Sequence, residues 1–250
     1  MTDSPAAAII AANLAAVRER IARAAEANGR TADAVRLVAV SKTFGLDAIR
    51  AAIDAGHRDF GENRVQEALP KIEALAAAHP DLRWHLIGHL QSNKARKAGR
   101  PFDAIHSVDS IDLLRRLDDA AAEGRRQPQF LVQVDLAGEA TKFGAPPDEA
   151  RAIVREATTL KAGRLVGLMT LPPFYDDPVA ARPVFARLRA FRDELVAEGI
   201  PAAQLAELSM GMSHDFEAAI AESWFTEEYR LETELRVGGE GLRIHRRLRP

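Results

Sequence analysis

The chain has 250 residues and a formal net charge of −2, with 34 Lys and Arg residues against 36 Asp and Glu residues. Hydrophobic residues make up 47% and charged residues 28%, which is ordinary for a globular protein and argues against disorder. The balanced charge argues against a dedicated nucleic-acid-binding protein, and the absence of cysteine excludes disulfides, thiolate metal sites and cysteine nucleophiles. No apolar run approaches the roughly 20 residues of a membrane helix, and no positive charge marks a signal peptide, so we expect a cytosolic protein.

In chain order, the sequence alternates between amphipathic segments and short apolar segments. An Ala-rich helix is predicted first, over residues 5–28. Strands are predicted over residues 35–40, 59–61, 84–88, 104–108, 130–135, 165–170, 207–210 and 235–238. Helices are predicted between them, over residues 46–55, 64–78, 110–122, 148–161 and 179–198.

The fold class follows from this alternation. Several predicted strands are apolar throughout, which is typical of strands covered on both faces. Eight strands alternating with helices in 250 residues match a single (β/α)8 TIM-type barrel, with one domain over residues 1–250. An open doubly wound sheet is the alternative, but it usually has a Gly-rich phosphate-binding turn after its first strand, where this chain has residues 41–44, Ser-Lys-Thr-Phe.

Lys42 follows the first predicted strand directly, where a barrel carries its reactive residues. Six of the 34 basic residues are Lys and the remaining 28 are Arg, so a Lys in an unusual position needs a specific reason. A Lys amine can form a Schiff base, which Arg cannot do at ordinary pH. Partial desolvation at the barrel mouth would lower the pKa of Lys42 and make it a better nucleophile toward an aldehyde. The alternative is a solvated lysine on a loop.

Other polar side chains stand at or near strand ends. Asn63 either caps the following helix or faces the barrel mouth, and His85 lies within the third strand. Met169 ends the sixth strand, where it is either a core residue or a contact for an aromatic ring. Ser209 and Ser213 surround a Gly ahead of a helix, which suits either an anion-binding cup of backbone N–H groups or a simple helix cap. No carboxylate keeps ligand spacing with the histidines of the third strand, so no metal site is expected.

Several segments together resemble the pyridoxal phosphate homeostasis proteins, the YggS/PROSC group. The resemblance covers roughly residues 8–221. The segments that carry it are Leu37-Val38-Ala39-Val40-Ser41-Lys42-Thr43, Phe60-Gly61-Glu62-Asn63-Arg64-Val65-Gln66-Glu67, Trp84-His85-Leu86-Ile87-Gly88-His89-Leu90-Gln91-Ser92-Asn93-Lys94, His106-Ser107-Val108-Asp109, Gly167-Leu168-Met169-Thr170 and Leu208-Ser209-Met210-Gly211-Met212-Ser213.

The resemblance implies a barrel of the alanine-racemase type, fold type III among pyridoxal phosphate (PLP) proteins, with PLP held as a Schiff base on Lys42. It implies a carrier or buffer for PLP homeostasis, with apo PLP-dependent enzymes as recipients and a monomeric state. The alternative is a fold type III amino-acid racemase or decarboxylase. Such enzymes need an acid or base on each face of the cofactor, often with help from a second domain for which 250 residues leave no room. A Schiff-base aldolase without cofactor is a third possibility.

The segment over residues 222–250 departs from the pattern of that family. Residues 223–232 are predicted to be an insertion, followed by the eighth strand. By the resemblance, Gly238 and Gly239 would then cup the phosphate beside Ser209 and Ser213, and Arg236 would lie near the pyridine nitrogen. The alternative is that everything past residue 221 is altered sequence. The Arg-rich residues 243–249 are predicted to be a solvated end.

Overall fold

The computed structural model describes residues 5–138, 143–222, 229–237 and 240–247, with side chains described as far as residue 222. The strands are β1 (Val35–Val40), β2 (Asp59–Glu62), β3 (Arg83–Leu86), β4 (Ala104–Val108), β5 (Gln129–Gln133), β6 (Arg164–Met169), β7 (Glu207–Ser209), β8 (Tyr229–Val237) and β9 (Glu240–Arg247). From β1 to β8 each strand runs parallel to the next, as expected when helical connections return the chain to the same edge.

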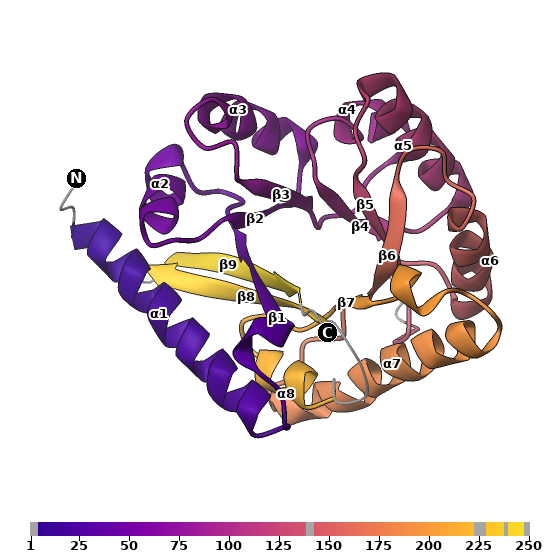
Figure 1. Ribbon diagram of the computed structural model, residues 1–250. Coiled ribbons are helices and arrows are strands. Elements are labelled where there is room, and N and C mark those ends of the chain that lie inside the picture. The colour runs from indigo at the N-terminus through magenta and orange to yellow at the C-terminus, as the bar shows by residue number, and fades with distance from the viewer. Residues whose placement is uncertain (1–4, 139–142, 223–228, 238–239, 248–250) are drawn as a thin grey trace.

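The sheet closes into a barrel, which confirms the predicted TIM-type fold. Residues 229–233 of β8 pair in parallel with residues 35–39 of β1, and Leu208 and Ser209 of β7 pair in parallel with the first two residues of β8. β9 folds back antiparallel to β8 and also pairs with residues 36–38 of β1. In Figure 1 this yellow hairpin extends from near α1 past β1 toward β7, and the helices surround the strands.

Helices cover the outside of the barrel. The α-helices are α1 (Pro5–Glu26), α2 (Leu46–Asp54), α3 (Val65–Ala76), α4 (Ala95–Ala98), α5 (Ile111–Gly124), α6 (Pro147–Ala157), α7 (Arg182–Ala197) and α8 (Phe216–Ala221). Short 3-10 helices are η1 (Ala32–Ala34), η2 (Ser92–Lys94), η3 (Pro178–Ala181) and η4 (Ala202–Gln204). The buried side of α1 is a stripe at helical spacing, made of Ile10, Leu14, Val17, Ile21 and Ala25, and this helix packs beside α2 and α8.

The predicted elements from β1 to β7 are confirmed, and most of their ends shift by one or two residues, but α6 ends at Ala157, four residues before its predicted end. β1 and β4 have the predicted bounds, and Ser110 caps α5 by accepting a hydrogen bond of 3.2 Å from Leu113 N. The predicted helix over residues 179–198 is divided into η3 and α7. The helix α4 was not predicted, because four residues are too few for a hydrophobic period to show.

The prediction for residues 223–238 was wrong in its boundaries. β8 begins at Tyr229, inside the segment predicted to be an insertion, and its pairing with β1 ends at Thr233. Residues 235–237, the described part of the strand predicted over residues 235–238, pair only with β9. The sequence contains the signal that was missed, because apolar and charged residues largely alternate with period two over residues 229–237.

Among the helices that the structure describes, none combines the length and the apolar character that crossing a membrane requires.

Candidate functional site

Lys42 occupies the turn that leaves the carboxyl end of β1, and its side chain is half-buried. Ser41 N donates to Gly61 O on β2 at 2.9 Å, and Phe44 N donates to Ser41 O at 3.1 Å, so the turn over residues 41–44 is closed by hydrogen bonds. Thr43 has φ of 67°, in the left-handed region that a β-branched residue rarely adopts. The surrounding structure therefore holds this turn, and Lys42 within it, in one specific conformation.

The ends of β6 and β7 bring Met169 and Ser209 together. The two residues are register partners, both are buried, and Thr170 N donates to Ser209 O at 3.1 Å. Close approach of the strands depends on Gly167, since a Cβ there would lie 1.7 Å from Glu207 O. These two predicted site residues thus share one position at the barrel mouth.

The loop after β7 carries the second predicted serine. Gly211 supplies a φ of 83°, which glycine adopts without strain. Asp215 then pins the loop, because its Oδ1 accepts from Met212 N at 2.5 Å and its own N–H donates to Met212 O at 3.1 Å. Burial raises the pKa of Asp215, and the bond from Met212 opposes that shift. Ser213 Oγ is buried and has no hydrogen-bond partner within the described part of the chain.

Asn63 lies in the turn after β2 and packs against the end of β3. The backbone of Asn63 leaves no room for a side chain at Gly88, where a Cβ would lie 2.3 Å from Asn63 O. Ser107 Oγ on β4 donates to Gly88 O at 2.7 Å, which continues the connection to the next strand. Among the described residues, Asn63 Oδ1 is buried without a hydrogen-bond partner.

A chain of polar side chains crosses the barrel interior beneath this mouth. Arg83 donates to Asp59 Oδ2 at 2.6 Å, and Asp59 Oδ1 lies 3.0 Å from His85 Nε2. His85 Nδ1 lies 3.1 Å from His106 Nε2, and His106 Nδ1 lies 2.8 Å from Ser209 Oγ. Because β4 and β7 are not neighbouring strands, the last contact can only cross the inside of the barrel.

The charge on Asp59 determines which atom donates the hydrogen bond between Asp59 and His85. Burial alone would raise the pKa of Asp59, but the hydrogen bond and charge of His85, together with Arg83 and Arg36, outweigh it. The pKa of Asp59 is therefore held well below its ordinary value, and the carboxylate is ionised. An ionised carboxylate only accepts, so His85 Nε2 carries the hydrogen of that contact.

Five of the predicted site residues lie at the barrel mouth, and the others do not or cannot be placed there. Lys42, Asn63, Met169, Ser209 and Ser213 all lie at or just after the carboxyl ends of their strands. His85 lies deeper, with its ring nitrogens facing Asp59 and His106, and its direct contact with a cofactor stays a prediction. The backbone of Arg236 lies in the part of β8 paired only with β9, its side chain is outside the described residues, and Gly238 and Gly239 lie outside them altogether.

Besides the partly exposed Arg83, two participants in the chain of polar side chains were missed by the sequence reasoning. His106 was part of the family resemblance but was assigned no role, although it and Ser107 are the polar residues of the strand Ala-Ile-His-Ser-Val. Asp59 opens the second strand and gave no signal beyond being charged at a strand start. A buried histidine next to an apolar run is the feature that could have identified the first of them.

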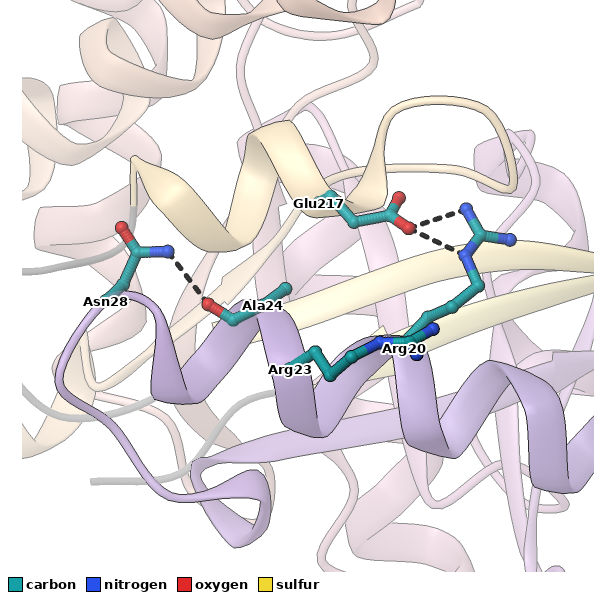
Figure 2. Close-up of a pocket in the computed structure, with 5 residues that line it drawn as sticks. All are labelled: Arg20, Arg23, Ala24, Asn28 and Glu217. Carbon is teal, nitrogen blue, oxygen red and sulfur yellow. Dashed lines mark hydrogen bonds and ion pairs between the residues drawn. The ribbon is translucent and has the colours of Figure 1, made fainter.

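A surface hollow of about 500 Å³ lies between α1 and α8, outside the barrel. Figure 2 shows Arg20 reaching Glu217 across it, with Arg20 Nε to Glu217 Oε1 at 2.7 Å, and Asn28 bonded to Ala24 O at 2.8 Å. The Arg20 guanidinium also lies 4.3 Å from the centre of the Phe216 ring. These contacts attach α8 to α1, so the hollow is a feature of helix packing rather than part of the site. Across the described residues, no group of three His, Asp or Glu side chains gathers as metal ligands would.

Comparison with known proteins identifies the family of this chain. The family model "Alanine racemase, N-terminal domain" matches residues 12–238. The pyridoxal phosphate homeostasis protein of Aquifex aeolicus is 41% identical over 209 residues, which cover 84% of this chain and 90% of that protein. A protein of unknown function from Bifidobacterium adolescentis has a crystal structure with a TM-score of 0.81 and 40% identity, covering 89% of this chain and 93% of that one. The structure of PipY from Synechococcus elongatus PCC7942, with PLP bound, has a TM-score of 0.75 and 43% identity, covering 86% of this chain and 94% of that one.

Proposed function

Because this chain belongs to the family of pyridoxal phosphate homeostasis proteins, we propose that it binds PLP and serves the homeostasis of the intracellular PLP pool as a carrier or buffer. The observation that carries the proposal is Lys42 on a closed, conformationally fixed turn at the mouth of the barrel. The proposal includes a cytoplasmic location, a monomeric state and apo PLP-dependent enzymes as recipients.

The polar groups at the mouth fit such a ligand. Asn63 Oδ1 and Ser213 Oγ are buried atoms that lack a hydrogen-bond partner among the described residues. A buried polar atom without a partner costs free energy, on the order of 1–3 kcal/mol, unless a ligand or water satisfies it. Both atoms lie at the strand ends where a barrel binds its ligands, so a ligand with several polar groups would satisfy them.

The proposed contributions follow from side-chain chemistry. PLP supplies an aldehyde that condenses with an amine, and Lys42 provides that amine. The backbone amides of Gly238 and Gly239 would cup its phosphate with Ser209 and Ser213 nearby, and Met169 would lie against the ring. Arg236 would face the ring nitrogen and keep it unprotonated, which weakens the ring as an electron sink and suits a carrier.

Catalysis of racemisation or decarboxylation is the alternative function. Such reactions need an acid or base facing each side of the bound cofactor. The chain has two tyrosines, Tyr175 and Tyr229, that are candidates for such a group. Tyr175 is partly buried and packs against the hydrophobic core, and its backbone carbonyl accepts a hydrogen bond of 3.0 Å from His214 Nε2. None of these contacts brings the Tyr175 phenol to the barrel mouth, so a carrier is proposed in preference to a catalyst.

The experiment compares retention, transfer and turnover in one preparation. Purified protein loaded with PLP is mixed with an apo PLP-dependent enzyme, and recovery of that enzyme's activity is followed. The same loaded protein is incubated with D- and L-amino acids. Binding of PLP with transfer and without turnover is expected. Failure to take up PLP would contradict the proposal, and robust racemisation would establish the enzyme alternative.

A further inference from the structure

Three side chains form a buried cluster directly behind the turn that carries Lys42. Ser41 Oγ donates to Glu62 Oε1 at 2.6 Å, and Lys71 Nζ donates to the same oxygen at 2.7 Å. Lys71 Nζ also donates to the backbone carbonyl of Ser41 at 2.7 Å. One ammonium group of α3 therefore holds both the side chain at the end of β2 and the carbonyl that immediately precedes Lys42.

The cluster lies on the outer side of the barrel wall. Leu37 and Ala39 belong to the core between β1 and the helices, and side chains alternate along a strand. Ser41 lies just after β1, and its contacts with Glu62 and Lys71 place it on the helix-facing side. The next residue, Lys42, can then face the opposite side, toward the barrel interior. The cluster therefore contacts the turn that carries Lys42 on the helix-facing side and is not part of the site at the barrel mouth.

The ion pair is buried and specific. The side chain of Glu62 is 0% exposed and that of Lys71 is 13% exposed. Glu62 Oε2 is also buried and has no hydrogen-bond partner within the described residues, so one oxygen takes both bonds. Burial raises the pKa of Glu62, and the bonds from Lys71 and Ser41 oppose that shift. Burying a carboxylate costs desolvation free energy unless a cation stays beside it. The ion pair therefore restrains both Lys71 and Glu62.

A single nitrogen of Lys71, its Nζ, makes both contacts. The lysine ammonium is a compact charge with three donors, and here it reaches a carboxylate and a carbonyl together. In a chain with six Lys among 34 basic residues, this use of lysine is informative. The second bond, to the carbonyl next to Lys42, links the ion pair to the turn over residues 41–44.

We propose that Lys71 and Glu62 are positioning residues for Lys42: they fix the Ser41 carbonyl and so aim the Lys42 amine into the barrel mouth for attachment of the PLP aldehyde. This inference rests on the proposed function, in which Lys42 is the site of attachment. The condensation joins the Lys42 nitrogen to the aldehyde carbon and releases one water molecule. The pair touches neither group and acts through the turn.

The test uses the double variant Lys71→Met with Glu62→Gln, which removes both charges together and so avoids leaving one of them buried alone. The rate of covalent attachment of PLP to Lys42 is measured on protein freed of PLP, by borohydride trapping and mass spectrometry across a range of pH. We expect the rate to fall at least tenfold. We also expect its pH midpoint to rise, because a loosened Lys42 gains water and its amine becomes harder to deprotonate.

The matched control is Arg58→Met with Asp81→Asn, at the amino end of the same strand. Arg58 likewise bonds a carboxylate, Asp81 at 2.5 Å, and a backbone carbonyl, Ile53 at 2.8 Å, but far from Lys42. This control should lose some thermal stability. Its attachment rate should stay within twofold of the wild-type rate, and its pH midpoint within a few tenths of a pH unit of the wild-type midpoint.

Each outcome decides the inference. Attachment by the folded Lys71/Glu62 variant within twofold of the wild-type rate and at the wild-type pH midpoint would overturn it. If that variant does not fold, Lys71→Arg decides, since it keeps a cation beside Glu62 but replaces the compact ammonium with a planar fork. A reduced rate with a raised pH midpoint supports the inference, and a wild-type rate overturns it. Failure of the wild-type protein to label at Lys42 would instead reject the proposed function.

Discussion

His106 Nδ1 on β4 lies 2.8 Å from Ser209 Oγ on β7, across the interior of the barrel. The contact connects a residue predicted to bind a cofactor phosphate with a buried chain that ends at the ionised carboxylate of Asp59. Ser209 therefore has two proposed roles. Its hydrogen bond with His106 stabilises the barrel interior, and its position at the end of β7 places it beside the proposed phosphate site.

Ser209→Ala tests both roles. Loss of the hydroxyl removes its hydrogen bond to His106, so the free energy of unfolding should fall by about 1–2 kcal/mol. PLP affinity should fall by about 5- to 30-fold, the equivalent of about 1–2 kcal/mol. Chemical denaturation and equilibrium titration measure the two effects. Ser110→Ala is the control, because it removes the cap of α5 and should lower stability by about 1 kcal/mol with PLP affinity unchanged. Equal affinity of Ser209→Ala and the wild type would remove Ser209 from the proposed site.

Gly167→Ala should prevent a stable barrel from forming. The added Cβ would lie 1.7 Å from the backbone oxygen of Glu207 on the neighbouring strand, and a backbone atom cannot move aside cheaply. We expect more than about 3 kcal/mol of destabilisation, or no folded protein. Gly45→Ala is the comparison, because its Cβ would meet nothing within 4 Å, and it should cost less than about 1 kcal/mol. Circular dichroism with thermal melting distinguishes them, and a Gly167→Ala melt like that of the wild type would refute the packing described here.

His57 predicts a stability loss in acid. Burial lowers its pKa from 6.5 to about 4, and its Nε2 lies 2.7 Å from Asp59 O. The unfolded state then binds the proton more readily, so the free energy of unfolding should fall as the pH drops from about 6.5 to about 4, by about 3 kcal/mol from this residue.

The measurement is denaturant unfolding across that pH range for the wild type and His57→Gln. The variant should be less stable at neutral pH but should lose less stability on acidification. His79→Gln, at a half-exposed histidine, should keep the wild-type slope. Parallel curves for the wild type and His57→Gln would show that His57 is not the group responsible.

Much of the fold was predictable because the strands carry a strong local signal. The apolar runs at residues 35–40 and 104–108 gave the exact bounds of β1 and β4. The end of the chain was harder to predict, because residues 229–237 are half charged, and a search for apolar runs passes over a strand that alternates. The antiparallel return of β9 depends on pairing with β8 and β1, which no local pattern encodes.

The candidate site was predictable only in part, for a similar reason. Lys42 stood out from composition and from its place after a strand, both of which are local properties. The contacts His106–Ser209 and Lys71–Ser41 join residues that are 103 and 30 positions apart. Only the closure of the barrel and the packing of α3 bring those pairs together, so spacing along the chain could not indicate them.

The most direct test of the central claim is to locate the attachment of PLP on the chain. Protein freed of PLP is incubated with it, reduced with borohydride, digested with trypsin and examined by mass spectrometry. The account predicts one modified peptide over residues 37–50, uncleaved after Lys42, and no modification of Lys42→Ala, which should fold as the wild type does because Lys42 belongs to no core. Absence of label, or label on other lysines with Lys42 unmodified, would contradict it.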